Sequence, residues 1–185
     1  MKNNKIVPLP IPLTEEIQNT MDKIFPSYLP SPNLYRIVAK NKVLFKELVE
    51  SEFIGPTGIF DKKRLSPSLR EKIILRTCIA SNNQYEFSLH ADTISQKMGI
   101  TNTQIEDIKK ITLNPEYWNN EDLVLFDLID CLVKKISVTD SIFEAMTNYY
   151  EEAQIIEIIH IIGFYTGVAM LVAFCKPELD NYKKI

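Results

Sequence analysis

The chain has 185 residues, 45% of them hydrophobic and 24% charged, and its formal net charge is −3. These values are typical of a soluble globular domain that buries an apolar core, alone or with an arm. They lack the basic surplus of a nucleic-acid-binding protein. The five glycines form no G-x-G-x-x-G or Walker pattern, so a phosphate-binding loop is also excluded.

No targeting or membrane segment is expected. The N-terminal M-K-N-N-K-I-V-P-L-P lacks the apolar stretch and the small-residue cleavage site of a signal peptide. Residues 155–174 come closest to the roughly 20 apolar residues of a membrane span, but polar residues and glycines interrupt them, which favours a buried helix. The cysteines are widely spaced and odd in number, which indicates reduced thiols in the cytoplasm: Cys78, Cys131 and Cys175.

Proline is concentrated at the start of the chain. Six of the ten prolines fall within residues 1–32. Spaced prolines favour extended backbone over packed elements, so we expect residues 1–32 to form a proline-rich N-terminal arm. Within it, T-E-E-I from Thr14 offers an N-cap and an acidic first turn, which favours a short helix. Residues 33–185 are expected to form one helical domain.

The remaining patterns predict seven or so helices. Residues 34–49 carry apolar side chains at helical spacing, and Asn41 either marks a turn between two helices or lies inside one. Glycines and a proline then break the pattern before Ser66-Pro67, a typical helix start. Further helices are expected over residues 66–83, over 84–98 with a stop at Gly99, from Thr101, and over 121–137, 141–152 and 151–176. Strand signals are weak, so the expected fold class is all-α, a compact multi-helix bundle.

Several of these segments resemble one known family. The run L-R-E-K-I-I-L-R, the E-F-S-L-H of the next helix and the tail G-I-T-N-T-Q-I-E-D-I resemble the carboxymuconolactone decarboxylase and alkylhydroperoxidase D-like superfamily. The resemblance covers roughly residues 33–180. It implies an alkylhydroperoxidase D-like bundle that assembles into dimers or trimers, sometimes trimers of dimers, with pockets near the subunit contacts.

One departure from this family bears on function. Its peroxidase-type members carry C-x-x-C-x-x-x-H, and counting back from His90 places those cysteines at Asn83 and Glu86. Without paired thiols, dithiol chemistry has neither its nucleophile nor its resolving partner. Cys78, further upstream, is interpreted as a small core residue. The E-F-x-x-H form instead resembles the decarboxylase branch of the family.

Glu86 and His90 are the candidate catalytic residues, because a four-residue spacing places both on one face of a helix. A carboxylate raises the pKa of a neighbouring imidazole, and such a pair acts as general acid and base near neutral pH. A protonated His90 would protonate the dienolate left by decarboxylation of a lactone acid, without metal or cofactor. Arg76 is a candidate ligand of the substrate carboxylate, or a structural partner of Glu71 or Glu86, and Tyr85 is a candidate hydrogen-bond donor to the substrate.

Two of these patterns have a purely structural alternative. Glu86 and His90 also fit an ordinary ion pair on a helix surface. Glu157 and His160 have the E-x-x-H spacing of di-iron sites, but such a site needs a second motif and two further glutamates. A buried His160 with a hydrogen bond in the core is therefore favoured, and no metal site is expected.

The expected protein is a cytoplasmic, homo-oligomeric enzyme without cofactor, which uses Glu86 and His90 on a small carboxylated or lactone substrate and has no nucleic-acid or membrane partner. One alternative is a non-catalytic binding or scaffold protein of the same family. Another, the least favoured, is a thiol-dependent antioxidant protein that would rely on Cys78. The long apolar helix expected at 151–176 is hard to bury in a monomer, which supports oligomerisation.

Overall fold

The computed structural model describes residues 5–56 and 58–181. These residues form nine α-helices and one short 3-10 turn, η1 (Ile59–Asp61), and contain no strand. The predicted all-α fold class is confirmed. The helices group into two compact units. The terminal unit combines the chain up to Arg64 with the chain from Val172 on, and the central unit is Leu65–Leu171.

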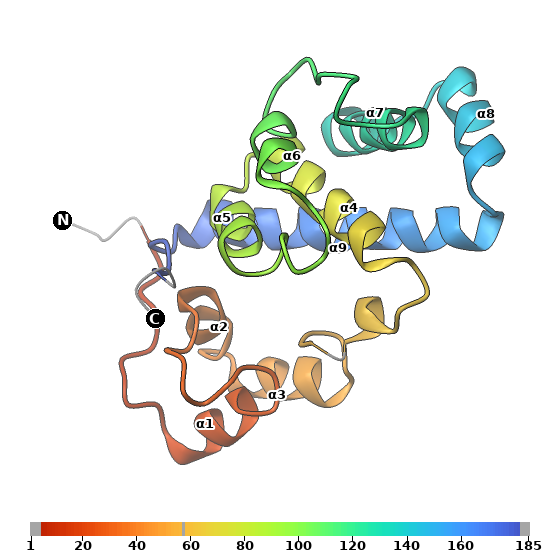
Figure 1. The fold of residues 1–185 in the computed structure, drawn as a ribbon. Coiled ribbons are helices and arrows are strands. Elements are labelled where there is room, and N and C mark those ends of the chain that lie inside the picture. Colours follow the sequence, from red (N-terminus) through yellow and green to blue (C-terminus); the bar gives the residue numbers. More distant parts are fainter. Residues whose placement is uncertain (1–4, 57, 182–185) are drawn as a thin grey trace. The chain divides into compact units, whose positions relative to one another are not determined.

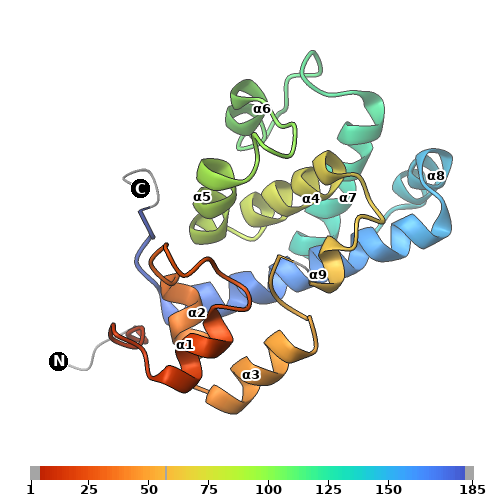
Figure 2. The same cartoon turned by 60° about the horizontal axis from the view of Figure 1, so that its bottom comes forward.

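The terminal unit is built on three short helices, α1 (Glu15–Met21), α2 (Asn33–Val38) and α3 (Lys42–Glu50), which lie together in both views (Figures 1 and 2). Asn41 separates α2 from α3, because its side-chain oxygen accepts a hydrogen bond from Leu44 N and caps α3. Of the two outcomes expected at Asn41, the turn between two helices is therefore the correct one. The core of the unit consists of Ile17, Met21, Ile24, Ala39, Phe45 and Val49.

The proline-rich segment packs on this unit. Residues 6–14 form no helix, and α1 starts directly after Thr14, as T-E-E-I predicts. Leu9 N donates to Arg36 O (3.4 Å), and the Arg36 guanidinium donates in turn to Leu9 O. A separate arm over residues 1–32 is not shown, and residues 1–4 of it lie outside the described residues. Its separate role stays a prediction.

The central unit has α4 in its middle, packed against both α5 and α7 (Figures 1 and 2). Fully burying one large apolar side chain stabilises a fold by roughly 1.5–3 kcal/mol. α4 and α7 together bury six such side chains, which are five aliphatic residues and Phe126. The helices of this unit are α4 (Pro67–Ala80), α5 (Gln84–Thr93), α6 (Asn102–Asp107), α7 (Asn120–Lys135), α8 (Asp140–Tyr149) and most of α9 (Glu152–Cys175). The six side chains are Ile73, Ile74, Leu75, Leu125, Phe126 and Ile129.

Local sequence determines where two of these helices begin. Ser66 Oγ accepts a hydrogen bond from Leu69 N (3.2 Å), and Pro67 is the first residue of α4, as predicted. At α6, Thr101 and Gln104 satisfy each other's backbone N–H groups in a capping box. Both predicted starts are confirmed.

The end of α5 differs from the prediction. The helix stops at Thr93 rather than continuing to residue 98 before Gly99. The chain then turns, Ser95 N donates to His90 O (2.9 Å), and the Ser95 side chain is buried. Ending α5 early therefore places a hydroxyl inside the central unit.

α9 is long and apolar. By length and composition alone it is able to cross a membrane, but the core helix of a soluble protein meets the same criterion, and 33% of its most apolar 18-residue window is buried in the molecule. The buried positions recur at a spacing of three or four, so one face of α9 is buried and the opposite face is exposed. The buried residues are Ile158, Ile161, Ile162, Tyr165 and Ala169.

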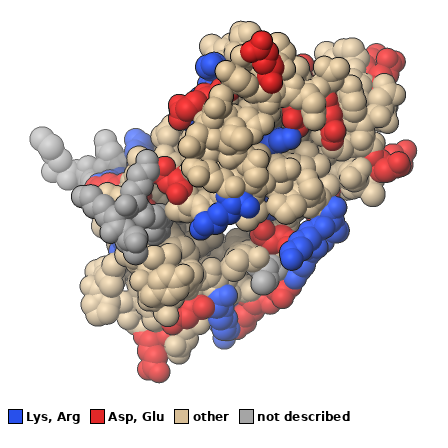
Figure 3. Space-filling view, viewed as in Figure 1, with Lys and Arg blue, Asp and Glu red and all other residues tan. Residues whose placement is uncertain are grey.

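Charged side chains of both signs occur together on the surface. On the face drawn in Figure 3, Lys and Arg side chains are interspersed with Asp and Glu side chains. This agrees with the small net charge of −3. Such a mixed surface gives little long-range attraction for a polyanion.

Candidate functional site

The start of α5 is positioned by the turn that joins it to α4. Asn82 adopts the left-handed conformation (φ 56°), which asparagine tolerates better than most residues. Asn82 N donates to Ile79 O (3.1 Å) and Asn83 N to Cys78 O (2.7 Å), which are the two bonds of a Schellman motif. Asn83 then caps α5, since its Oδ1 accepts from Glu86 N (3.2 Å). Because of this turn, α5 begins at Gln84, only four residues after α4 ends at Ala80.

His90 lies between two carboxylates, one from each of these helices. Its Nδ1 is 3.0 Å and 3.1 Å from the two carboxylate oxygens of Glu71 on α4. Its Nε2 is 3.6 Å from Glu86 Oε1, one turn earlier on α5. The spacing of Glu86 and His90 therefore brings them together as expected, and Glu71 joins them as a third member. We refer to these three residues as the Glu71–His90–Glu86 cluster.

The cluster is buried. The Glu71 side chain is 0% exposed, that of His90 5% and that of Glu86 12%. Ser95 Oγ donates to Glu71 Oε1 (2.6 Å), so the innermost carboxylate accepts hydrogen bonds from both a ring and a hydroxyl. The alternative of an exposed surface ion pair between Glu86 and His90 is therefore wrong. Glu86 is the most exposed of the three.

The carboxylates decide the charge of His90. Burial favours the neutral ring, but the charge and hydrogen bond of Glu71, followed by those of Glu86, raise the pKa of His90 to about 9. Burial also opposes ionisation of Glu71. The charge and hydrogen bond of His90, the hydrogen bond of Ser95 and the charge of Arg70 nevertheless hold the pKa of the Glu71 carboxyl below its ordinary value. At neutral pH His90 is thus an imidazolium, with one N–H directed at Glu71 and the other on the side of Glu86.

Other side chains of the central unit border the cluster. The Tyr165 ring of α9 meets the His90 ring edge to face, with centroids 5.7 Å apart. Cys78 is buried, and its burial, then the charges of Glu86 and Glu71, raise the pKa of its thiol well above the ordinary value. Asn83, the N-cap of α5, has a buried Nδ2 without a hydrogen-bond partner among the described residues.

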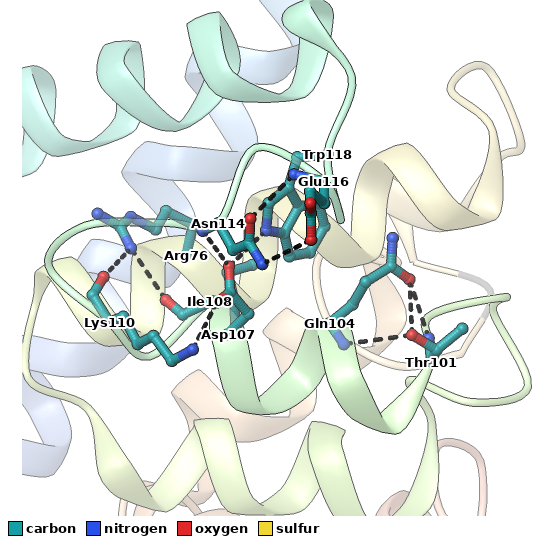
Figure 4. Close-up of polar contacts among 9 residues, drawn as sticks. All are labelled: Arg76, Thr101, Gln104, Asp107, Ile108, Lys110, Asn114, Glu116 and Trp118. Carbon is teal, nitrogen blue, oxygen red and sulfur yellow. Dashed lines mark hydrogen bonds and ion pairs between the residues drawn. The ribbon is translucent and has the colours of Figure 1, made fainter.

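Arg76 is held by protein groups. Its Nε and Nη2 donate to the two carboxylate oxygens of Asp130 on α7 (2.8 and 2.7 Å), and its Nη1 donates to Ile108 O and Lys110 O (2.9 and 3.0 Å). Figure 4 shows the guanidinium directed at these two carbonyls after α6. The expected ion pair with Glu71 or Glu86 is wrong, because Asp130 takes that place. The role of Arg76 as a substrate ligand stays a prediction.

The segment that follows α6 is fixed by Asp107. Trp118 Nε1 and Asn114 N donate to Asp107 Oδ2 (2.8 and 2.9 Å), and Lys110 Nζ contacts Oδ1 (2.8 Å), as Figure 4 shows for these residues. The Trp118 ring packs edge to face on Phe126 of α7, with centroids 4.9 Å apart. These contacts hold the carbonyls to which Arg76 binds.

Tyr85 is buried on α5, directly before Glu86. Successive helical residues point about 100° apart, so the Tyr85 side chain leaves α5 on a different side from Glu86 and His90. Its role as a hydrogen-bond donor to the substrate stays a prediction.

His160 is placed differently from the expectation. It is exposed on α9 rather than buried in the core, and its Nδ1 contacts Ile156 O of its own helix (2.8 Å). The core position is wrong because residue 160 lies on the exposed face of α9. Within residues 5–56 and 58–181, no group of three or more His, Cys, Asp or Glu side chains is arranged to hold a metal ion.

Glu71 is the site residue that the sequence reasoning missed. It lies 19 residues before His90, so helical spacing within one element does not connect the two. A signal was nevertheless present: Glu71, Ile74 and Cys78 share one face of α4, which makes Glu71 a carboxylate among apolar positions. A buried carboxylate requires a partner, and the chain has only two histidines to offer.

No protein-family model matches the chain, and neither does any curated protein. Solved structures do match. The apo form of the debrominase Bmp8 superposes with a TM-score of 0.77 at 15% identity, covering 97% of this chain and 94% of that one. An uncharacterized peroxidase-related protein from Silicibacter sp. TM1040 gives 0.75 at 14% identity, covering 97% and 95%. The chain has the alkylhydroperoxidase D-like fold.

The fold expected from the resemblance is thus confirmed over nearly the whole chain. A variant of the debrominase in complex with 2,3,4-tribromopyrrole also superposes, with a TM-score of 0.74 at 17% identity and coverage of 97% and 93%. At these identities the likeness concerns the fold, and the E-F-x-x-H subtype and the chemistry rest on the residues of this chain.

Proposed function

We propose that the protein is a cofactor-free enzyme in which the Glu71–His90–Glu86 cluster transfers a proton to a small carboxylated or lactone substrate. The observation that carries this proposal is the position of His90, which is buried between two carboxylates that raise its pKa to about 9. Groups with strongly raised pKa values at such places are typical of acid–base sites.

Each member of the cluster has a separate task in this proposal. Glu71 holds Nδ1–H and fixes the ring, while Nε2–H is the proton that is given away. When the carbon–carbon bond to the substrate carboxylate breaks, carbon dioxide leaves. The electron pair of that bond stays on the lactone ring of the substrate, which becomes a dienolate. His90 then gives its Nε2 proton to carbon, and the neutral imidazole regains a proton from water by way of Glu86.

Asn83 is proposed to bind a substrate oxygen. Asn83 is the N-cap of α5, three residues before Glu86 and seven before His90. The Asn83 side-chain oxygen is used for capping, and its buried Nδ2 has no partner among the described residues. An amide donor beside the proton donor would stabilise the negative oxygen of a dienolate.

A thiol-based reaction is less well supported. Asn83 and Glu86 occupy the positions where a C-x-x-C pair would stand before His90. Cys78, the nearest thiol, is buried and its pKa is raised, so it stays protonated and a poor nucleophile.

The debrominase in complex with 2,3,4-tribromopyrrole supports a small cyclic ligand for this fold. The three free cysteines support a cytoplasmic location, which we also propose.

The test is decarboxylation of carboxymuconolactone, followed by release of carbon dioxide and by incorporation of deuterium from heavy water. We expect turnover by the wild type and a loss of at least about a hundredfold in Glu86→Gln and His90→Asn. Asn83→Ser keeps a capping oxygen but removes Nδ2. It should lower kcat while leaving the melting temperature nearly unchanged.

Glu106→Gln is the matched control, since the Glu106 side chain is 71% exposed on α6 and pairs with Lys109. It should leave both turnover and melting temperature unchanged. If the wild type turns over neither carboxymuconolactone nor other small carboxylated lactones, or if Glu86→Gln unfolds the chain, a non-catalytic binding or scaffold role replaces the proposed one.

A further inference from the structure

Ser95 is bound to both residues of the Glu71–His90 pair. Its hydroxyl donates to Glu71 Oε1 (2.6 Å), and its backbone N–H donates to the carbonyl oxygen of His90 (2.9 Å). The same Glu71 oxygen also lies 3.0 Å from His90 Nδ1. Ser95 is completely buried, as is Glu71. A hydrogen bond in such surroundings is electrostatically stronger than one in water.

The backbone around Ser95 holds the hydroxyl in this position. α5 ends at Thr93, and the chain turns so that Met98 N and Ile100 N both donate to Ser95 O (3.1 and 3.0 Å). Gly99 lies in this turn with a φ of 90°, a conformation that residues with a Cβ atom rarely adopt. These contacts use only the backbone of Ser95, so a variant that lacks the hydroxyl retains all of them.

The buried pair of Glu71 and His90 has two forms that contain the same number of protons. In the ionic form the shared proton is on His90 Nδ1, so the ring is an imidazolium and Glu71 is a carboxylate. In the neutral form that proton has moved to Glu71, and the ring keeps a proton only on Nε2. Burial favours the neutral form, because a low-dielectric interior opposes charge. A hydrogen bond donated to Glu71 favours the ionic form, since a charged acceptor binds roughly twice as strongly as a neutral one.

From this arrangement we infer that Ser95 is a positioning residue, whose hydroxyl keeps the shared proton on His90 Nδ1 rather than on Glu71. Ser95 acts through Glu71, which lies on the Nδ1 side of the ring. For its consequence the inference rests on the proposed function. An imidazolium readily gives up its Nε2 proton, whereas a neutral ring that carries its only proton on Nε2 is a very weak acid. Without the hydroxyl, Glu71 takes the Nδ1 proton, and His90 stops acting as a proton donor.

Other charged groups near the pair also favour the ionic form. Glu86 acts on the His90 ring, and the charge of Arg70 acts on Glu71. Cys78 adds no charge, because the raised pKa of its thiol keeps it protonated. None of these groups changes when Ser95 is substituted. A comparison of Ser95 variants therefore isolates the contribution of the hydroxyl.

The test is nitrogen NMR of the full chain at pH 7, with isotope-labelled histidine rings. A protonated ring nitrogen and an unprotonated one resonate far apart, so the spectrum reports directly on which nitrogens of His90 carry a proton. We expect both to be protonated in the wild type. In Ser95→Ala, Nδ1 should lose its proton while Nε2 keeps one, and turnover should fall at least about tenfold. Ser95→Thr, which restores a hydroxyl, should return the Nδ1 signal toward that of the wild type.

Ser81→Ala is the matched control. Ser81 Oγ makes a hydrogen bond of the same length (2.6 Å), but to the backbone carbonyl of Thr77 rather than to the cluster. Its loss should leave both ring nitrogens of His90 protonated. Ser95→Cys has a side chain of similar size and a much weaker donor, so it repeats the test if Ser95→Ala does not fold.

A His90 Nδ1 that keeps its proton in Ser95→Ala and in Ser95→Cys overturns the inference. A wild-type ring that is already neutral at pH 7 overturns it as well, because the pair is then not ionic even with the hydroxyl present. Failure of the proposed function is distinguishable from both results. A wild type that turns over no carboxylated lactone refutes the proposed function alone, since the spectra do not depend on turnover.

Discussion

Of the surrounding side chains, Glu71 has the largest influence on the protonation state in which His90 would enter the proposed reaction. A histidine with its ordinary pKa of about 6.5 is mostly neutral at pH 7 and acts first as a base. Next to Glu71 and Glu86 the pKa of His90 rises to about 9, so in the proposed reaction the ring would start as an acid. Ser95 contributes indirectly, because its hydroxyl holds the Glu71 carboxylate in place.

The raised pKa of His90 predicts a pH-dependent stability. Folding favours the protonated ring, so this stabilisation is fully present below about pH 6.5 and is lost as the pH rises through about 9. Between pH 6.5 and 8 the free energy of unfolding should fall by about 1.5 kcal/mol, at up to about 1.4 kcal/mol per pH unit. Urea denaturation at several pH values measures this slope.

Glu71→Gln provides the comparison for that slope. It removes the charge that contributes most to the raised pKa of His90, so the pKa should move toward its ordinary value and the slope above pH 7 should flatten. NMR titration of the imidazole protons of the variant checks the pKa directly. A wild-type stability that does not change between pH 6.5 and 8 would show that His90 is not protonated in the folded chain.

The sequence predicted two of the three residues of this cluster. The spacing of Glu86 and His90 lies within one helix, where periodicity alone places both side chains on one face. Glu71 was missed because its contact with His90 crosses between α4 and α5. Such a contact depends on how two helices pack, and spacing along the chain carries no information about that.

At the level of elements, helix starts were predictable and the end of α5 was not. Ser66-Pro67 and Thr101 specify the starts of α4 and α6 through hydrogen bonds within three residues. α5 stops at Thr93, well before Gly99, because Ser95 is drawn inward to bond Glu71 on another helix. A tertiary hydrogen bond therefore overrides the local stop signal.

Arg76 ties α4 to α7 and to the segment after α6, which leads to a prediction for Arg76→Lys. A lysine has no planar fork for the two Asp130 oxygens, and it leaves the carbonyls of Ile108 and Lys110 without their donor. We expect a loss of about 2–4 kcal/mol in the free energy of unfolding. Urea denaturation followed by circular dichroism measures it.

Arg64→Lys is the comparison for this substitution, because Arg64 is exposed and the same chemical change there should cost less than about 0.5 kcal/mol. An Arg76→Lys variant with unchanged stability but reduced turnover would instead identify Arg76 as the predicted substrate ligand.

At the scale of the whole molecule, the helical spacing of apolar residues and the weak strand signals predicted the fold class, and the pairing of the two ends of the chain was not predictable. Lys5 pairs with Glu178 (2.6 Å), Ile6 N donates to Cys175 O (3.1 Å), and Asn33 N donates to Asp180. These contacts join residues about 150 positions apart or more, so no local pattern indicates them. They place the end of the chain in the same unit as its beginning.

The burial of the three cysteines predicts their order of reactivity. Cys78 and Cys175 are buried, and burial raises the pKa of both thiols, whereas Cys131 is partly exposed. A dithionitrobenzoate reagent should therefore label Cys131 of the native protein first and the other two at least about tenfold more slowly.

Labelling in guanidinium chloride, where all three thiols are accessible, gives the reference rate for this comparison. Replacement of Cys131 by serine should remove the fast phase and leave the slow one. If Cys78 reacts as fast as Cys131, reagents reach the thiol near the Glu71–His90–Glu86 cluster. That result would favour the antioxidant alternative.

The single tryptophan of the chain gives the central unit an optical signal of its own. Trp118 is buried, and its indole N–H is bound to the Asp107 carboxylate. Exposure to water shifts indole emission to longer wavelength, so the fluorescence spectrum follows the unfolding of Leu65–Leu171 and contains no tryptophan from the terminal unit. Circular dichroism follows the helices of both units. Comparing the two signals on one unlabelled sample therefore separates the melting of the unit that holds His90 from that of the rest of the chain.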